Sequence, residues 1–348
     1  MKAITTPMKI TVIGAGSWGT AMAIHAAKSL INKTEITLCP RLEIQAQALV
    51  SDGENKRYLP GIKLPPNLKI NALWQDIFTV PNESEHLLVI ATPFSGLKKL
   101  TEDILSLGKF PKHWIWLCKG IDPDNGKLSH EILSEVFVKH PNSSKVNSGI
   151  LSGPSFAIEV AKGLPCALTI ASSDQELCQL VQNSFHHGNM RIYATDDVVG
   201  VELGGAIKNI LAIASGIADG LHLGLNARAA LITRGMAEMT RLGIAMGAQT
   251  ETFAGLTGLG DLILTATGDL SRNRRVGLAL AQGQSLQEIL HNLGHVAEGV
   301  RCANAVLELA NSHQVDMPIV QAVVKVLEQK LTPQDAVLEI MSRDPRQE

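Results

Sequence analysis

Short apolar runs alternate with longer stretches of helical length over the first half of the chain. The runs have little internal alternation, as buried parallel strands do, and they lie at residues 10–13, 35–39, 87–91, 114–118 and 149–151. Stretches of helical length, such as 21–30 and 97–107, separate several of them. This order predicts a doubly wound α/β sheet. Two later apolar runs, at 167–171 and 190–194, are expected to add strands to it.

The pattern changes from about Asp196. Ala, Leu, Gly and Met dominate, and no proline occurs between Asp196 and Pro318. Helices are predicted at residues 199–221, 227–246, 275–282 and 297–312. We therefore expect an α/β domain over residues 1–195 and an all-α helical domain over residues 196–348.

Composition narrows the class of protein. The chain of 348 residues is long enough for two domains with separate cores, and 45% hydrophobic with 18% charged residues suits an ordered globular protein. A formal net charge of −2 offers no basic field for nucleic acid or an anionic membrane. An anionic ligand must therefore be held by a few well-placed cations.

The cysteines and the hydropathy of the chain predict the cellular compartment of the protein. The five cysteines include no C-x-x-C pair, which favours reduced thiols in the cytoplasm. Residues 1–9 lack the apolar run of a signal peptide. The most hydrophobic stretch, 210–218, is shorter than a membrane span, so we expect no membrane insertion. The histidines have no spacing typical of a metal site, and none is predicted.

A glycine motif directly follows the first strand. Gly14, Gly16 and Gly19 form G-x-G-x-x-G before a helix. In dinucleotide-binding proteins the first glycine permits a tight turn, the second lets the backbone approach a pyrophosphate, and the third allows close helix–strand packing. Because the motif has the required strand–turn–helix context, we predict a Rossmann-type dinucleotide-binding domain.

The residues after the second strand bear on the choice of dinucleotide. Arg41 stands where an NAD-specific site usually has Asp or Glu for the ribose 2′-hydroxyl. A guanidinium can bind a 2′-phosphate through two parallel N–H···O hydrogen bonds, which favours NADPH. The alternative is that Arg41 is a solvated residue at a helix start.

A lysine lies within an apolar helix of the second domain. On the predicted helix face, Lys208 neighbours Gly204, Gly205, Leu211 and Ala212, so we expect a crevice beside it. Desolvation there lowers a lysine pKa towards a value suited to proton transfer. The alternative is a lysine that extends along the helix surface into water.

Two polar segments follow Lys208. In the first, glycines at 255–260 suggest a loop that places Asp261 and Thr265 on one helix face, where Asp261 can pair with Lys208 or, taken alone, act as an N-cap. In the second, Ser271 or Asn273 begins a helix next to Arg272, which is a suitable phosphate site. The alternative for the second segment is a basic surface turn.

These elements together resemble the NAD(P)-dependent glycerol-3-phosphate dehydrogenase family, most closely its bacterial biosynthetic members, over nearly the whole chain. The motifs are G-A-G-S-W-G-T-A at 14–21, N-K-R-Y-L-P at 55–60, C-K-G at 118–120, L-S-G-P-S-F-A at 151–157, E-L-G-G-A-I-K-N at 202–209, G-L-G-D-L at 258–262, S-R-N-R at 271–274 and V-A-E-G at 296–299. One departure is Cys39-Pro40 before Arg41, where the family often has Trp followed by Gly, Ala or Ser.

The resemblance implies a role for each matching position. Lys208 would be the general acid/base, and Lys119 a second active-site cation that contacts substrate and cofactor. The other implied substrate contacts are Gly153, Ser155, Asp261, Thr265, Ser271, Arg272 and Asn273, the last two at the phosphate. The implied cofactor contacts, besides the three glycines and Lys119, are Ser17, Trp18, Arg41, Tyr58, Ala157, Arg272, Val296 and Glu298.

The implied reaction is reversible reduction of dihydroxyacetone phosphate to sn-glycerol 3-phosphate with NADPH or NADH, which supplies glycerol 3-phosphate for phospholipid synthesis. The resemblance also implies a cytoplasmic homodimer. One alternative is a related Rossmann-plus-helical dehydrogenase that acts on a hydroxy or keto acid. Another is a non-catalytic nucleotide sensor, against which the set of Lys119, Lys208 and Asp261 argues.

Overall fold

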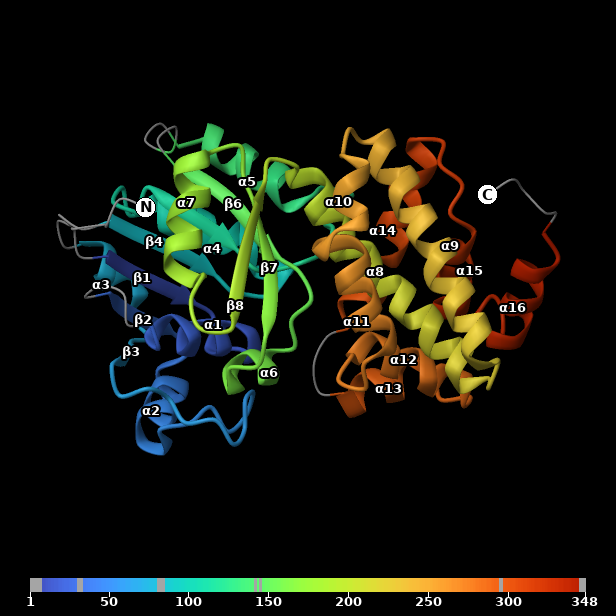
Figure 1. The fold of residues 1–348 in the computed structure, drawn as a ribbon, viewed down its shortest axis with the longest axis horizontal. Helices are drawn as coiled ribbons and strands as arrows, with labels where there is room; N and C mark the ends of the chain where they lie inside the picture. Colours follow the sequence, from blue (N-terminus) through green and yellow to red (C-terminus); the bar gives the residue numbers. More distant parts are fainter. Residues whose placement is uncertain are drawn as a thin grey trace. The chain divides into compact units, whose positions relative to one another are not determined.

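The fold is known from a computed structural model, which describes residues 8–29, 34–79, 85–140, 143, 146–293 and 297–343 (Figure 1). The chain divides into two compact units. The first comprises Met1–Cys118 and Ser129–Val198, and the second comprises Lys119–Leu128 and Val199–Glu348, as far as these ranges are described. Residues 119–128 thus belong to the helical unit, although the sequence places them among the strands.

The first unit contains an eight-stranded sheet in the order β3-β2-β1-β4-β5-β6-β7-β8 (Figure 1). The strands are β1 (Met8–Ile13), β2 (Glu35–Cys39), β3 (Leu68–Ile70), β4 (Glu85–Ile90), β5 (His113–Trp116), β6 (Asn147–Ser152), β7 (Cys166–Ala171) and β8 (Met190–Thr195). All neighbours are parallel except β6 and β7. The predicted doubly wound sheet is confirmed, with an added short strand β3 and an antiparallel step that the pattern did not predict.

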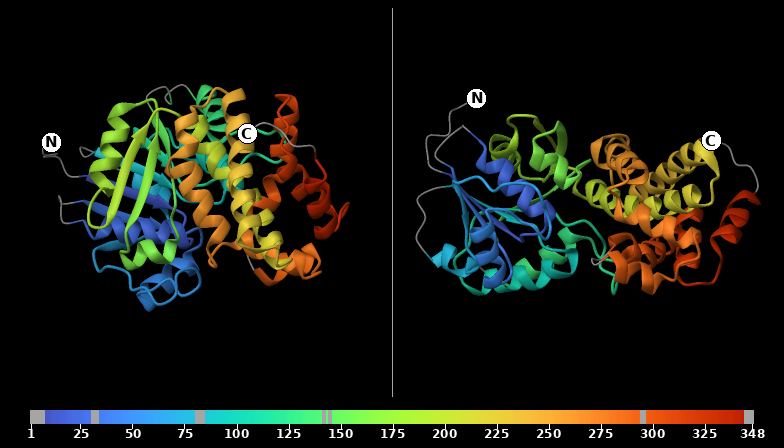
Figure 2. Two further views of the ribbon diagram at one scale, coloured as in Figure 1. Left: turned by 45° about the vertical axis from the view of Figure 1, so that its right-hand side comes forward. Right: turned by 90° about the horizontal axis from the view of Figure 1, so that it is seen from below.

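Helices cover both faces of this sheet (Figure 2, right). They are α1 (Ser17–Ala27), α2 (Glu43–Asp52), α3 (Trp74–Thr79), α4 (Leu97–Ser106), α5 (Ser129–Val138), α6 (Ala157–Lys162) and α7 (Gln175–Phe185), with a 3₁₀ turn at Phe94–Gly96. Ile10 and Val12 of β1 pack in one core with α1, α6 and α7. In β4, Leu88 and Ile90 alternate with that core's residues and are also fully buried. Burial on both faces explains why these strands read as continuous apolar runs.

The site for a dinucleotide is positioned by the strand order. β1 pairs with β2 on one side and with β4 on the other. The chain therefore reverses its direction of winding beside β1. In open α/β sheets, ligands bind at the carboxyl ends of the strands at such a reversal, and the glycine motif follows the carboxyl end of β1.

The second unit is helical, as predicted. Its elements are α8 (Val198–Gly220), α9 (Gly224–Ala245), α10 (Thr250–Ala254), a π-helical turn (Leu256–Gly260), α11 (Asp261–Thr267), α12 (Arg272–Ala281), α13 (Leu286–Leu293), α14 (Glu298–Ser312), α15 (Pro318–Leu327) and α16 (Pro333–Met341). Ile121 and Leu128, from the segment Lys119–Leu128, pack into its core.

Helix α8 is the centre of the second unit. Among the described residues it is the single helix long and apolar enough to cross a membrane, but 89% of its most apolar window is buried inside the protein. The apolar stretch 210–218 is part of this longer helix. Its burial by the surrounding helices is typical of a core helix.

Candidate active site

The three glycines of the motif have three different surroundings in the first unit. Gly14 has φ +116°, and a Cβ there would lie 2.6 Å from the backbone of Ala91. A Cβ on Gly19 would lie 2.0 Å from the carbonyl oxygen of Gly14, whereas a Cβ on Gly16 would meet nothing within 4 Å. The turn and the packing thus require Gly14 and Gly19, while the backbone at Gly16 is left open to a ligand. This pattern fits the approach of a pyrophosphate.

Ser17 and Tyr58, two of the predicted cofactor residues, are in contact beside this turn. Ser17, the first residue of α1, donates a hydrogen bond from its hydroxyl to the backbone carbonyl of Tyr58, at 2.7 Å. Trp18 is partly buried and packs against the core of the first unit. The N-terminus of α1 has no side-chain cap, so its first N–H groups remain available to an anion.

Arg41 follows β2 at the same edge of the sheet. The Gly14 N–H donates to the carbonyl of Cys39, the last residue of β2, at 2.9 Å. Arg41 is exposed, and it forms no hydrogen bond or ion pair within the described part of the chain. Arg41 lies two residues before Glu43, the first residue of α2. This placement fits a contact with a 2′-phosphate and a solvated side chain equally well.

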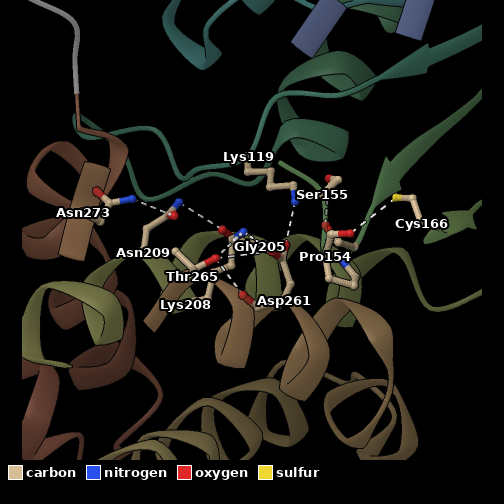
Figure 3. A network of polar contacts seen from close by, with 11 residues as sticks. Lys119, Pro154, Ser155, Cys166, Gly205, Lys208, Asn209, Asp261, Thr265 and Asn273 are labelled. Carbon is tan, nitrogen blue, oxygen red and sulfur yellow. Dashed lines mark hydrogen bonds and ion pairs between the residues drawn. The ribbon is translucent and has the colours of Figure 1, made fainter. Parts of the chain in front are cut away.

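A third group of predicted residues lies between β6 and α6. Gly153 has φ +138°, a conformation that favours glycine, and its carbonyl accepts a hydrogen bond from the Ser155 hydroxyl at 3.1 Å. The Cys166 thiol lies 3.5 Å from the carbonyl of Pro154 (Figure 3). Ala157 begins α6 and packs against the core of the first unit. The structure brings Gly153, Ser155 and Ala157 together in one short loop.

In the second unit, one carboxylate is shared by two lysines (Figure 3). Asp261, at the start of α11, accepts a hydrogen bond from Lys208 Nζ on Oδ1, and its Oδ2 lies 2.6 Å from Lys119 Nζ. Lys208 also donates to the Thr265 hydroxyl at 3.1 Å, and that hydroxyl donates to the backbone carbonyl of Asp261 at 2.6 Å. The predicted pairing of Lys208 with Asp261 is therefore present, and both lysines face the same anion.

The glycines beside Lys208 do not leave an empty crevice. A Cβ on Gly205 would lie 3.3 Å from the aliphatic chain of Lys119, and a Cβ on Gly204 would lie 2.7 Å from the carbonyl of Thr257. The space next to Lys208 is thus filled by Lys119 and by the π-helical turn. The small residues serve to bring these two segments close to α8.

Burial and charge set the pKa values of this cluster. Burial lowers the pKa of Lys208 to about 7; the carboxylate of Asp261 opposes this shift, and the charge of Lys119 adds to it. Burial by itself would raise the pKa of Asp261, but the charges of Lys119 and Lys208 hold it below its usual range. A lysine that titrates near neutrality beside a carboxylate that is ionised at neutral pH can both donate and accept a proton.

Asp261 lies at a helix start and pairs with Lys208, as expected, but its local structure differs from the prediction in two respects. It is the first residue of α11 rather than an N-cap, and it follows a π-helical turn instead of a loop. Only 1% of Asp261 is exposed. Such π-helical turns are frequent at functional sites, and this one aims the carboxylate at the two lysines.

The predicted phosphate segment contains side chains with distinct roles. Ser271 is the N-cap of α12, since its hydroxyl accepts the Arg274 N–H at 3.2 Å. Arg274 pairs with Asp219 at 2.7 Å and so holds α12 against α8. Arg272 is exposed and forms no hydrogen bond or ion pair among the described residues. Arg275 is likewise exposed and its guanidinium forms no hydrogen bond or ion pair in the described part of the chain, so these two guanidiniums are available to an anion.

Asn273 connects three helices. Its side-chain amide donates to Asn209 Oδ1 at 2.9 Å (Figure 3). Its side-chain carbonyl oxygen accepts the Gly299 N–H at 3.1 Å. Asn209, next to Lys208 on α8, is therefore part of the network. It had no predicted role, although a polar residue inside so apolar a helix was a signal.

The remaining predicted cofactor residues lie at or near the start of α14. Glu298 is the first residue of that helix. Burial raises the pKa of Glu298, and the charges of Arg301 and Arg272 oppose this shift. Val296 lies outside the described residues. Among the residues that are described, no group of three metal-ligating side chains occurs.

Family models match both parts of the chain. Residues 9–178 match the family model of the NAD-dependent glycerol-3-phosphate dehydrogenase N-terminus, and residues 197–338 match that of its C-terminus. A relative from Polynucleobacter asymbioticus, named glycerol-3-phosphate dehydrogenase [NAD(P)+], is 55% identical over 97% of this chain and 99% of its own. A relative of the same name from Ralstonia nicotianae is 54% identical over 98% and 99%.

Solved structures lead to the same family. Glycerol-3-phosphate dehydrogenase from Coxiella burnetii superposes with a TM-score of 0.87 at 37% identity, over 97% of this chain and 99% of the other. A 2-dehydropantoate 2-reductase from Geobacter metallireducens reaches a TM-score of 0.56 at 14% identity, over 93% and 100%, and so shares the fold alone. This chain belongs to the NAD-dependent glycerol-3-phosphate dehydrogenase family.

Proposed function

We propose that this protein interconverts dihydroxyacetone phosphate and sn-glycerol 3-phosphate with NAD(P)H and NAD(P)+. The observation that carries the proposal is the buried carboxylate of Asp261, shared by Lys208 and Lys119, in a chain whose relatives are glycerol-3-phosphate dehydrogenases [NAD(P)+]. A lysine with a pKa near 7 is suited to the proton transfer that ketone reduction requires.

Each site residue of the second unit is assigned a part in this reaction. Lys208 donates a proton to the ketone oxygen in reduction and accepts it back in oxidation. Lys119 stabilises the negative charge that develops on that oxygen. Asp261 and Thr265 hold the ammonium of Lys208 in place, while Arg272 and Asn273, with Ser271, bind the phosphate. When bound, the reduced nicotinamide supplies the hydride.

The first unit is proposed to bind the dinucleotide. The backbone at Gly14, Gly16 and Gly19 with the start of α1 would hold the pyrophosphate. Ser17, Trp18, Tyr58, Ala157, Val296, Glu298, Lys119 and Arg272 are proposed as further cofactor contacts, and Gly153 and Ser155 as substrate contacts. Arg41 is exposed after β2 and forms no hydrogen bond or ion pair among the described residues, so we propose that its guanidinium can bind the 2′-phosphate of NADPH.

A dehydrogenase acting on a hydroxy or keto acid is less well supported. Proteins of that kind share the fold at 13–14% identity, whereas the glycerol-3-phosphate dehydrogenases of two bacteria are 54–55% identical to this chain. A non-catalytic nucleotide sensor would not need the Lys119–Asp261–Lys208 cluster. We also propose that the enzyme is a cytoplasmic homodimer that provides glycerol 3-phosphate for phospholipid synthesis.

A steady-state assay tests the proposal. The purified protein should oxidise NADH and NADPH when dihydroxyacetone phosphate is added, and it should not do so with pyruvate or 2-dehydropantoate. Running both nucleotides in parallel gives the cofactor preference. Turnover with a keto acid and none with the phosphate ester would overturn the assignment.

A further inference from the structure

Asn55 is a buried amide with three hydrogen bonds, and no role in cofactor binding has been assigned to it above. It is 3% exposed and begins the turn that leads to Tyr58. Its Nδ2 donates to the carbonyl of Ala15 at 3.0 Å and to the Thr20 hydroxyl at 2.8 Å, and its Oδ1 accepts the Tyr58 N–H at 3.3 Å. These contacts satisfy the amide and join the glycine turn, helix α1 and the Tyr58 segment.

The carbonyl of Ala15 stands between Gly14 and Gly16, and it accepts a second side-chain amide. Gln45 Nε2 donates to it at 3.0 Å, so both lone pairs of this oxygen are occupied. The peptide that joins Ala15 to Gly16 is planar and trans, which directs its N–H opposite to its carbonyl. Fixing the carbonyl therefore also fixes the direction of the Gly16 N–H.

The Gly16 N–H has no protein acceptor within the described part of the chain. It lies where an added Cβ would meet nothing within 4 Å. On the other side of the turn, the Ser17 hydroxyl donates to the carbonyl of Tyr58 at 2.7 Å. The glycine turn and the Asn55–Tyr58 segment are thus bound to each other in both directions.

We propose that Asn55 is a positioning residue for the dinucleotide: it holds the Ala15–Gly16 peptide so that the Gly16 N–H faces the pyrophosphate, and it holds the Tyr58 segment beside it. The inference rests on the proposed dinucleotide-dependent function. Because Asn55 acts through the backbone, its loss should weaken nucleotide binding more than it slows turnover at saturating nucleotide.

The first test compares Asn55→Ala with wild type by titration of NADPH and NADH fluorescence. Removing the donor leaves the buried Ala15 carbonyl with one partner, and we expect Kd for both nucleotides to rise by about tenfold. The KM for nucleotide should rise in parallel, with kcat at saturation within about threefold of wild type, well below that change.

A matched control separates positioning from stability. Asn67 also donates its amide to a backbone carbonyl of this unit, that of Ala27 at 2.8 Å, at the far end of α1. Asn67→Ala should leave both nucleotide affinities unchanged, with the melting temperature of each variant recorded. Equal nucleotide affinity in Asn55→Ala and wild type, or equal loss in the Asn67 variant, would overturn the inference.

A second variant gives a readout that a structural role alone would not change. In Asn55→Asp, an ionised carboxylate faces the Ala15 carbonyl and repels it, whereas the protonated acid can donate one hydrogen bond to it. The affinity of this variant for nucleotide should rise as pH falls, relative to that of Asn55→Ala. Parallel pH profiles would contradict the proposal, and failure of wild type itself to bind either nucleotide would instead contradict the proposed function.

Discussion

Asp261 pairs with both Lys119 and Lys208, so its buried carboxylate keeps one cation when either lysine is replaced. In Lys208→Ala, the carboxylate stays buried but keeps its contact with Lys119 at 2.6 Å, so no unpaired charge is left inside the unit. We expect the variant to fold and to bind NAD(P)H, since the glycine turn belongs to the first unit. Its kcat should fall by roughly 10²–10⁴-fold, the usual effect of losing a general acid.

Nucleotide titration, a thermal melt and steady-state kinetics on the same Lys208→Ala preparation check this prediction. If folding and binding are intact while turnover stays within about threefold of wild type, far less than a general acid contributes, the proton comes from another group.

The titration of Lys208 predicts opposite pH profiles for the two directions of the reaction. Burial lowers the pKa of Lys208 to about 7, so its ammonium form declines as the pH rises through that value. Reduction needs the ammonium and should slow above pH 7, whereas oxidation needs the neutral amine and should accelerate. The measurement is log kcat against pH in both directions. Profiles that break only near the ordinary lysine pKa would show that Lys208 is not the titrating acid.

Arg272 is the residue at which the identity of the cation matters most. The Arg272 guanidinium is exposed and forms no hydrogen bond or ion pair among the described residues, so it can bind a phosphate through two N–H groups, which an ammonium cannot do. Arg272→Lys should therefore lower kcat/KM for dihydroxyacetone phosphate by roughly tenfold or more. Arg275→Lys, an exposed change on the same helix, is the matched control and should be near wild type. Indistinguishable kinetics for the two variants would remove Arg272 from the phosphate site.

At the scale of an element, the glycine turn after β1 separates stability from binding. Gly19→Ala would place a Cβ 2.0 Å from the Gly14 carbonyl, so this variant should lose stability or fail to fold. Gly16→Ala meets no protein atom within 4 Å and should melt close to wild type. It should nevertheless bind nucleotide about tenfold more weakly or worse, because the methyl group occupies the approach of the pyrophosphate. Melting curves and nucleotide titrations of both variants test this, and tight binding by Gly16→Ala would contradict it.

Helix α15 is capped by a side chain from another helix. Glu238 of α9 is 1% exposed and accepts the N–H groups of Ile319 at 2.8 Å and Val320 at 3.3 Å. Burial raises the pKa of Glu238 to about 7, and these two hydrogen bonds oppose the shift. Glu238→Ala leaves two buried donors without an acceptor and should cost roughly 1–3 kcal/mol in the free energy of unfolding.

The pH dependence of this cap has a definite sign. Between the ordinary value of 4.5 and about 7, the folded carboxyl binds a proton that the unfolded one has lost. Its contribution to stability is therefore complete below that window and declines as the pH rises through about 7. Glu238→Gln removes this titration, so its stability relative to wild type should improve on going from acidic to alkaline pH. Denaturant unfolding at several pH values measures it, and a constant difference would contradict the assignment.

For the whole molecule, the main features of the fold follow from the sequence. Seven strands and the four helices α8, α9, α12 and α14 of the second unit were predicted, because their segments are apolar runs or of helical length. Strand β3 was missed because Leu68–Ile70 is only three residues at the edge of the sheet. The antiparallel pairing of β6 with β7 was also missed, since strand direction depends on the path of the connecting chain.

The candidate site was predictable to a smaller extent. The Lys208–Asp261 pair followed from a lysine in an apolar helix and a carboxylate at a helix start. The packing of Lys119 against Gly205 did not, because it depends on a segment distant in sequence. The contacts of Asn55 and Asn209 were likewise hidden, since a single amide in a sequence does not show which carbonyl it will meet.

The placement of Lys119–Leu128 bears on how such an enzyme can be recombined. This stretch belongs to the helical unit but is encoded between two parts of the sheet unit. A single genetic crossover anywhere between Ser129 and Val198 would combine the Lys119 loop of one parent with the Gly205 and Asp261 of the other. A hybrid that exchanges the helical unit between distant relatives therefore needs three junctions, so that the loop and the helices around Lys208 descend from the same parent.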